Sequence, residues 1–303
     1  MATIQASGLR KSYGSLEALK GVDIEVSEGE CFAFLGPNGA GKTTVVEILE
    51  GYRPRSGGEA RVLGKDPADF GRRERERIGV VLQSCNVQAE LTVRESIQQY
   101  AGYYTSPLDT DRVLDLVGLR EQSDQRAGRL SGGQQRRLDV GLALVGDPEL
   151  IFLDEPTTGF DPSARRQAWE VVDGLKELGK TIFLTTHYMD EAEALADRVA
   201  VIFKGRIVAE GSPATLGGRD RAETVISCVL SGSAERQVPA FEGNCVRDGD
   251  ALHLRTPEPV VSLHVLTGWA RETGVDLLDL QVHRPTLEDI YLGLTREHEE
   301  EDG

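Results

Sequence analysis

The sequence has 303 residues, of which 39% are hydrophobic and 28% are charged. Its apolar runs are far shorter than the roughly 20 residues of a membrane-spanning helix, so no segment is expected to cross a bilayer. The formal net charge of −16 disfavours binding to nucleic acid. The N-terminal segment lacks the apolar core of a secretory signal, and the cysteines lack C-x-x-C spacing. We therefore expect a cytoplasmic protein with reduced cysteines.

Residues 1–217 alternate apolar runs with helical patterns, which is typical of an α/β domain. The expected strands are residues 22–26, 31–35, 78–82, 150–153 and 181–186. The segment 199–211 predicts a hairpin that turns at Lys204 and Gly205. Between residues 84 and 146 the strand patterns give way to helical periodicity. This change predicts an α-helical subdomain inserted into the domain.

Residues 218–296 form a second block, in which short strand patterns accompany helical patterns at 259–272 and 285–295. A block of this length can bury only a modest core, so we expect a small C-terminal α+β domain. The last residues, 297–303, are mostly acidic and are expected to form a disordered tail.

A glycine-rich segment follows the expected strand 31–35 and precedes a helical pattern. Its residues 36–43, GPNGAGKT, fit the P-loop pattern G-x-x-x-x-G-K-[ST]. The backbone N–H groups of such a loop converge on phosphate oxygens, and the following helix start adds partial positive charge. Lys42 is expected to reach the β- and γ-phosphates of a nucleotide, and Thr43 to offer a hydroxyl to Mg²⁺. An ordinary glycine-rich turn would not require the full pattern in this context.

Two acids, Asp154 and Glu155, end the apolar run that begins at residue 150. After a phosphate loop, an acid at a strand end is typical of the Walker B carboxylate, which orients the hydration shell of Mg²⁺. Glu155 lies where it could accept a proton from an attacking water. A solvated loop is the alternative reading of such a pair taken alone.

The stretch LSGGQ, residues 130–134, precedes another helical pattern. Ser131 and Gln134 have the spacing of a capping box, which would simply start the helix. A helix start flanked by glycines is also an anion site, because capping and phosphate binding use the same N–H donors. The two roles are therefore compatible.

These motifs, in this order, resemble those of the nucleotide-binding subunits of ATP-binding cassette (ABC) transporters. The resemblance covers roughly residues 3–215 and implies a P-loop NTPase fold of the ABC ATPase type. LSGGQ is the signature of that family, where it faces the γ-phosphate of ATP held by the other subunit. The resemblance therefore implies a homodimer that forms on ATP binding. Its signature contacts would come from Ser131, Gly132, Gly133 and Gln134.

The resemblance assigns roles to further residues. Tyr13 is similar to the aromatic residue that stacks on adenine, although a tyrosine at a strand end could simply pack there. Gln83 is similar to the Q-loop glutamine, and His187 to the switch histidine that contacts the γ-phosphate. Asp161 is similar to the D-loop acid that serves communication between the subunits. Asp161 followed by Pro162 is also a suitable N-cap pair for a helix.

The cofactors implied are ATP and Mg²⁺. The ATP-binding residues implied are Tyr13, Gly36, Asn38, Gly39, Ala40, Gly41, Lys42, Thr43 and Thr44. The catalytic residues implied are Glu155, His187 and Gln83. The Mg²⁺ ligands implied are Thr43, Gln83 and Asp154.

The segments 186–213 and 285–295 are similar to a group of bacterial exporters that includes the daunorubicin/doxorubicin resistance ATP-binding proteins. Members of that group carry an extra C-terminal domain and pair with a separate integral membrane permease of the ABC-2 type. The resemblance implies an ATPase on the inner face of the cell membrane that powers efflux of a drug-like or other amphipathic substrate. The substrate, the permease and the role of the C-terminal domain stay open.

A soluble mechanochemical ABC ATPase of translation or DNA repair shares the same motifs and is the alternative. Translation-type members usually carry two cassettes, whereas this chain has one phosphate loop and one LSGGQ. Repair-type members separate their ATPase halves by long coiled coils, but here Lys42 and Ser131 lie within one domain without sustained heptads. The acidic composition also disfavours DNA.

Overall fold

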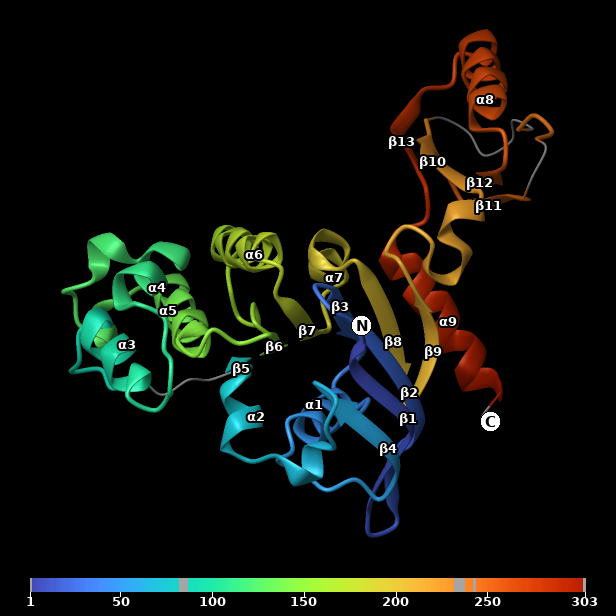
Figure 1. Ribbon diagram of the computed structural model, residues 1–303. Helices are drawn as coiled ribbons and strands as arrows, with labels where there is room; N and C mark the ends of the chain where they lie inside the picture. Colours follow the sequence, from blue (N-terminus) through green and yellow to red (C-terminus); the bar gives the residue numbers. More distant parts are fainter. Residues whose placement is uncertain (1, 82–86, 232–237, 242–243, 302–303) are drawn as a thin grey trace. The chain divides into compact units, whose positions relative to one another are not determined.

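The computed structural model describes residues 2–81, 87–231, 238–241 and 244–301. It divides into two compact units, Met1–Pro213 and Ala214–Gly303. The composition placed this boundary after residue 217, a few residues further along the chain. The first unit contains a six-stranded sheet, a three-stranded sheet and a helical segment (Figure 1).

The six-stranded sheet forms the centre of the first unit, with the strand order β5-β6-β7-β3-β8-β9. The bounds are β5 (Ile78–Val81), β6 (Leu150–Asp154), β7 (Thr181–Thr186), β3 (Cys31–Leu35), β8 (Arg198–Phe203) and β9 (Arg206–Gly211). Neighbouring strands from β5 to β8 pair in parallel. All residues of β3 and β7 are buried, which explains why these strands are continuous apolar runs without alternation.

The predicted hairpin is confirmed, since β8 and β9 pair antiparallel around Lys204 and Gly205. Both turn residues have positive φ, 46° for Lys204 and 81° for Gly205. This conformation matches the twist of the flanking strands.

The three-stranded antiparallel sheet has the order β2-β1-β4. It consists of β2 (Leu16–Ser27), β1 (Ala2–Tyr13) and β4 (Gly57–Val62). Only the part of β2 at residues 22–26 was predicted. The β1 pairing with β2 contains several register shifts, and such irregularities interrupt the alternation of apolar and polar residues by which strands are found in a sequence. Both sheets contribute to one apolar core, in which Phe32, Phe34 and Phe152 each stack near Phe183.

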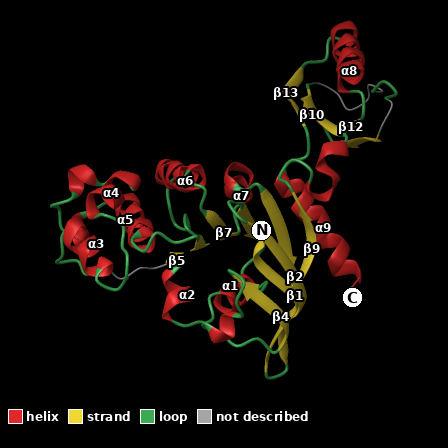
Figure 2. Ribbon diagram, in the orientation of Figure 1, coloured by secondary structure: helices red, strands yellow, loops and turns green. Residues whose placement is uncertain are grey.

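Helices lie on both sides of the six-stranded sheet (Figure 2). On one side are α1 (Lys42–Leu49) and α2 (Arg72–Glu76), and on the other α6 (Pro162–Glu177) and α7 (Met189–Leu195). The helical segment contains α3 (Val93–Ala101), α4 (Thr110–Leu116) and α5 (Gly132–Leu144). The described residues 87–146 form helices, turns and loops, and their β pairing is limited to one isolated bridge, between Thr92 and Arg126. The predicted helical character of this insert is therefore confirmed for that stretch.

The second unit contains an antiparallel sheet in the order β11-β12-β10-β13. Its bounds are β10 (Thr224–Leu230), β11 (Asn244–Asp248), β12 (Ala251–Thr256) and β13 (Leu277–His283). Helix α8 (Pro259–Thr273) packs through Leu266 on the buried face of this sheet. Helix α9 (Leu287–Glu301) runs into the segment 297–303, whose disorder stays a prediction. This unit has the expected α+β composition.

Among the described residues, no helix combines the length and the hydropathy that crossing a membrane requires. Cys31, Cys228 and Cys245 carry free thiols, and the first two are buried. Burial raises the pKa of the Cys31 thiol to about 12, so this side chain remains a protonated, unreactive part of the core.

Glu50, at the C-terminal end of α1, is a carboxyl group inside the first unit. Its side chain is 5% exposed, and Oε1 has no hydrogen-bond partner among the described residues. Burial raises the pKa of Glu50 to about 8, and the nearby charges of Asp154 and Glu47 add to this shift. Over a range of pH the folded protein therefore keeps the Glu50 carboxyl protonated, whereas the unfolded chain has lost this proton. Because the folded state binds more protons there, the free energy of unfolding decreases as the pH rises through this range.

We expect Glu50→Gln to remove this pH dependence. The wild-type Tm should fall, relative to that of the variant, as the pH is raised from 5 to 9, because only the wild type must ionise a buried group. Thermal unfolding across this range measures the difference, and Glu59→Gln, at an exposed position of β4, is the control. Parallel pH profiles for wild type and Glu50→Gln would contradict the assignment.

Candidate nucleotide-binding and hydrolysis site

Three neighbouring parallel strands end at the same edge of the six-stranded sheet. The register pairs Leu35 of β3 with Thr186 of β7, and Asp154 of β6 with Thr185 of β7. The residues that follow these strands must therefore lie close together, as is usual for ligand sites in parallel α/β sheets. Figure 1 shows these strands side by side within the first unit. Their ends bring together the phosphate loop, the two acids and His187.

The phosphate loop connects β3 to α1 through glycines that the packing requires. A Cβ atom on Gly36 would lie 2.4 Å from the carbonyl oxygen of Ile202. Gly41 has a φ of 112°, in the region that glycine adopts most readily. Lys42 begins α1 and is only 5% exposed. Its Nζ donates hydrogen bonds to the carbonyl oxygens of Gly36 at 2.8 Å and Pro37 at 3.3 Å, so the ammonium lies over the loop.

Glu155 connects this loop to His187. Its Oε1 lies 3.1 Å from Lys42 Nζ, and its Oε2 lies 3.3 Å from His187 Nδ1. The Thr158 hydroxyl also donates to Oε2 at 3.1 Å. Burial alone would raise the pKa of Glu155, but the hydrogen bond and charge of Lys42, assisted by His187, lower it on balance. Glu155 is therefore a carboxylate at neutral pH, the form that can accept a proton.

Thr185, which the sequence analysis did not single out, holds both acids. Its hydroxyl accepts a hydrogen bond from the Glu155 N–H at 3.1 Å and donates one to Asp154 Oδ1. Thr185 is fully buried in β7. The signal available in the sequence was a pair of threonines at the end of an otherwise apolar strand, because a buried hydroxyl requires a partner.

Tyr13 lies at the end of β1, beside the start of α1. Its hydroxyl is 3.4 Å from Thr44 Oγ1, and its ring is 39% exposed. Lys11 Nζ and Arg53 Cζ lie 5.2 and 5.3 Å from the ring centroid. A flat, accessible ring beside the phosphate loop and two cations can stack on a base whose phosphates the loop holds.

The remaining predicted loop residues flank Lys42. Asn38, Gly39 and Ala40 lie between β3 and α1, and Thr43 and Thr44 lie in the first turn of α1. Thr43 is exposed, so its hydroxyl is accessible to a ligand. Gln83 lies outside the described residues.

The signature residues lie at another helix start. Ser131 caps α5, with its Oγ accepting from the Gln134 N–H at 3.3 Å and its own N–H donating to Gln134 Oε1 at 3.0 Å. Ser131 and Gly132 are exposed, and Gly133 is half-buried. The capping box is thus present, and the N-terminal end of α5 remains accessible. The signature and the phosphate loop therefore precede two different helices, α5 and α1.

Asp161 has the structural role that its sequence context allows. Its Oδ1 accepts hydrogen bonds from the N–H groups of Ser163 and Ala164 at 2.8 and 2.9 Å, and so caps α6. The side chain is exposed, so the cap leaves its second oxygen accessible. A role in communication between subunits stays a prediction.

Comparison with known proteins gives the family. The sequence model of the ABC transporter family matches residues 19–158. The chain is 39% identical over 306 residues to the Nod factor export ATP-binding protein I of Rhizobium sp. (strain N33), covering 96% of each protein. The chain belongs to the ATP-binding subunits of ABC transporters. It is also 37% identical to the daunorubicin resistance ATP-binding protein DrrA2 of Streptomyces coeruleorubidus, covering 96% of this chain and 94% of the relative.

Solved structures agree with this membership. The ADP conformation of MJ1267, an ABC transporter cassette, superposes with a TM-score of 0.63 at 28% identity, over 70% of this chain and 91% of that cassette. The dimeric bacterial cassette MJ0796 superposes with a TM-score of 0.61 at 26% identity, over 69% and 98%. Residues 224–286 match the C-terminal domain of ABC transporter domain-containing-like proteins.

These matches confirm the predicted family and the P-loop α/β fold with an added C-terminal domain. They also confirm the predicted activity, an ATPase subunit of the exporter type. The alternative of a soluble mechanochemical ATPase receives no support from these relatives, which span nearly the whole chain.

We expect Thr185→Val to slow hydrolysis about tenfold, because the isosteric side chain removes the hydroxyl that donates to Asp154. ATP affinity should change little, since the phosphate loop is untouched. Steady-state ATPase rates and calorimetry measure the two effects. Thr181→Val, at the opposite end of the same buried strand, is the control, and a wild-type turnover number in Thr185→Val would contradict this role.

Proposed function

We propose that two copies of this chain enclose two ATP molecules and hydrolyse them to power export through a separate membrane subunit. The convergence of Lys42, Glu155 and His187 carries this proposal. The accessible start of α5 supports it, because it offers phosphate-binding groups away from the subunit's own loop. The relative MJ0796 is described as a dimer, and also as a dimer bound to ADP and Pi.

In this arrangement, one subunit holds each nucleotide through Lys42, Thr43 and the amides of its phosphate loop. The other subunit completes the site with Ser131, Gly132 and Gly133 at the N-terminal end of α5. Partial positive charge at a helix start and the N–H groups there favour phosphate oxygens. ATP therefore stabilises the closed dimer by bridging two surfaces, and hydrolysis removes that bridge.

Glu155 acts as the general base for the attacking water. Its Oε1 is paired with Lys42 in the structure. Phosphate oxygens compete for that ammonium, and this competition frees the carboxylate to accept a proton from water. His187, 3.3 Å from the other oxygen, can then orient the water or hydrogen-bond to the γ-phosphate.

The residues of the site suit an Mg²⁺ ion that takes most of its ligands from the nucleotide and from water. Within the described residues, no group of three or more His, Cys, Asp or Glu could hold a metal by itself. Mg²⁺ commonly takes one or two protein oxygens and completes its shell with phosphates and water. The exposed Thr43 hydroxyl and the Asp154 carboxylate suit that donor set, and Gln83 is proposed as a third ligand. When bound, the ion would neutralise phosphate charge.

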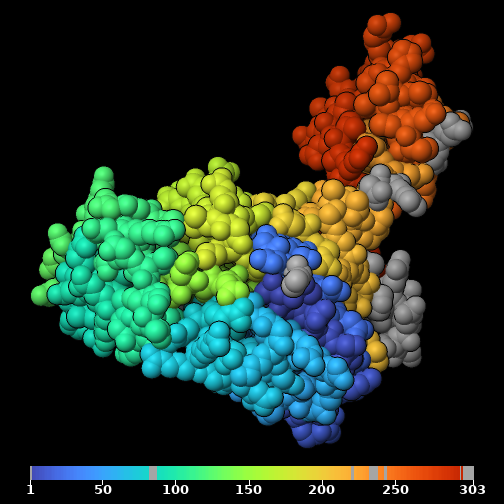
Figure 3. Space-filling view, viewed as in Figure 1, coloured from blue at the N-terminus to red at the C-terminus, as the bar shows by residue number. Residues whose placement is uncertain are grey.

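A groove of the first unit is proposed as the docking surface of the membrane subunit. Its volume is about 1110 Å³, and its lining comes from α1, α2, β5, α3 and α5. Apolar and aromatic side chains dominate it, and Tyr52 and Tyr103 are 66% and 63% exposed. Exposed aromatic residues around a concave apolar surface are typical of protein interaction sites. Figure 3 shows the helical segment, in green, against the cyan segment that contains α2.

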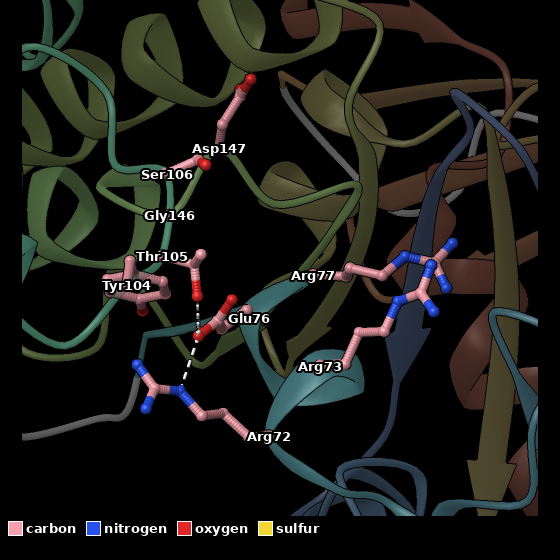
Figure 4. A pocket seen from close by; sticks show the side chains of 9 residues that line it. All are labelled: Arg72, Arg73, Glu76, Arg77, Tyr104, Thr105, Ser106, Gly146 and Asp147. Atoms are coloured by element: carbon pink, nitrogen blue, oxygen red, sulfur yellow. Dashed lines mark hydrogen bonds and ion pairs between the residues drawn. The ribbon is translucent and has the colours of Figure 1, made fainter.

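A second hollow of about 540 Å³ adjoins this groove and shares Arg72, Glu76 and Tyr104 with it. In Figure 4, Arg72 and Thr105 approach Glu76 from opposite sides, whereas Arg73 and Arg77 point away. Arg72 Nε and the Thr105 hydroxyl donate to Glu76 Oε1 at 2.8 and 3.0 Å. The bond from Thr105 connects α2 to the segment after α3, and so supports one wall of the groove.

The relatives' names concern export of a Nod factor and resistance to daunorubicin. We therefore place this chain on the inner face of the cell membrane and propose an amphipathic export substrate. Substrate selection would belong to the membrane subunit. The two sites proposed here have other ligands, since the nucleotide site binds ATP and the groove binds the membrane subunit itself.

We expect Glu155→Gln to bind ATP normally, to slow hydrolysis by about 10²- to 10⁴-fold, and to accumulate as an ATP-bound dimer. The amide retains the shape of the side chain but accepts no proton. ATPase assays combined with gel filtration measure both effects. Full turnover in the variant would show that another group is the base.

We expect Tyr103→Asp to weaken capture of a coexpressed ABC-2-type membrane subunit, because it places a charge on an apolar docking surface. The ATPase activity of the isolated chain should stay near that of the wild type. Leu178→Asp alters another exposed apolar side chain, at the end of α6, and is the control. Equal copurification of both variants would remove the groove from the proposal.

A further inference from the structure

The loop that carries Glu155 is held in an uncommon conformation. Glu155 has a φ of 46°, in the left-handed region that is unfavourable for a residue other than glycine. Such a conformation persists only where surrounding contacts fix it. Two buried charged residues, neither used in the site described above, contact this loop at Pro156 and Thr157.

The first of these residues, Arg136, belongs to the signature helix. It lies in α5 five positions after Ser131, which is about one and a half helical turns. Its side chain is 6% exposed, and its Nε donates to the carbonyl oxygen of Pro156 at 2.9 Å. Asp139, one turn further along α5, lies 3.8 Å from its guanidinium. The residue after Glu155 is thus bonded to the helix that presents the signature.

The second residue, Glu191, lies in α7, the helix that begins two residues after His187. It is fully buried, and its Oε1 accepts hydrogen bonds from the Thr157 hydroxyl at 2.8 Å and the Trp169 indole at 3.3 Å. Burial raises the pKa of Glu191, whereas hydrogen bonds from Thr186, Thr157 and Trp169 oppose that shift. Glu191 therefore connects the loop to α6 and to the end of β7, next to His187.

We propose that Arg136 and Glu191 are positioning residues that hold the Glu155 loop between the signature helix and the helix after His187. Through Arg136, the contact of α5 with one nucleotide sets the position of the carboxylate that acts on the other. This inference rests on the proposed two-subunit site, because only there does α5 meet a nucleotide held by a partner.

The physical reason is the stiffness of the connecting elements. A hydrogen-bonded helix moves as a body, so a shift of Ser131 moves Arg136 and displaces Pro156 with it. Glu191 holds the other side of the loop at Thr157, so the displacement changes the conformation of Glu155 instead of translating the whole loop. The strained φ of Glu155 makes its geometry sensitive to both bonds.

A double-mutant cycle tests this coupling. Arg136→Met removes the bond to Pro156 while retaining an unbranched side chain, and Ser131→Ala removes a signature hydroxyl. We expect Arg136→Met to lower kcat about tenfold at nearly unchanged ATP affinity. We expect Ser131→Ala to lower kcat clearly less in the Arg136→Met background than in the wild type. In that background the bond between α5 and Pro156 is already missing, so a change at Ser131 no longer reaches Glu155.

Arg137→Met is the matched control, since Arg137 lies on the same helix but donates to the carbonyl oxygen of Gly118. Its effect should add to that of Ser131→Ala. Thr157→Val tests the Glu191 side with a nearly isosteric change, and it keeps the proposal testable if Arg136→Met fails to fold. It should lower kcat without lowering ATP affinity, whereas Thr181→Val should do neither.

Additive losses for Ser131→Ala and Arg136→Met, or wild-type kcat in Thr157→Val, would overturn this inference and leave the two-subunit site intact. If wild-type protein formed no dimer with ATP, the proposed function would fail together with it. Gel filtration of Glu155→Gln with ATP separates these two outcomes.

Discussion

The site depends on the parallel pairing of β3, β6 and β7, which fixes three chain segments at one edge of the sheet. Each strand ends within one or two residues of a group with a chemical role: the phosphate loop, Asp154 with Glu155, and His187. Their register is in turn fixed by a core of phenylalanines from the same three strands. The positions of the phosphate loop, the two acids and His187 therefore depend on the packing of this apolar core.

Within this frame, one cation serves two purposes. Lys42 satisfies the carbonyl oxygens of its own loop and pairs with Glu155, so the buried ammonium and the half-buried carboxylate neutralise each other. In the proposed mechanism, phosphate oxygens replace these partners of Lys42 and leave Glu155 to accept a proton. The ion pair between Lys42 and Glu155 is then exchanged for contacts to the nucleotide. The Thr185 hydroxyl accepts from the backbone N–H of Glu155, so it holds the backbone of this residue independently of Lys42.

The sequence predicted the elements whose signal is local. Fully buried strands such as β3 and β7 are short apolar runs, and the phosphate loop follows from consecutive residues. It did not reveal β1 and β4, whose alternation is broken by register shifts. Nor did it single out Glu50, Arg136, Thr185 or Glu191. These residues acquire their roles through burial and through partners distant in the sequence, as for Glu191 and Thr157. Only the folded chain brings such groups together.

The central claim, that each ATP is held by the phosphate loop of one subunit and the signature of another, is tested most directly by mixing two defective proteins. Lys42→Ala lacks the phosphate-binding ammonium, and Ser131→Glu repels phosphate at the signature. Neither variant alone can build an intact site, but a mixed dimer contains one. Energy transfer between differently labelled subunits should therefore report ATP-dependent association only in the mixture. Association of either variant alone, or none in the mixture, would contradict the account.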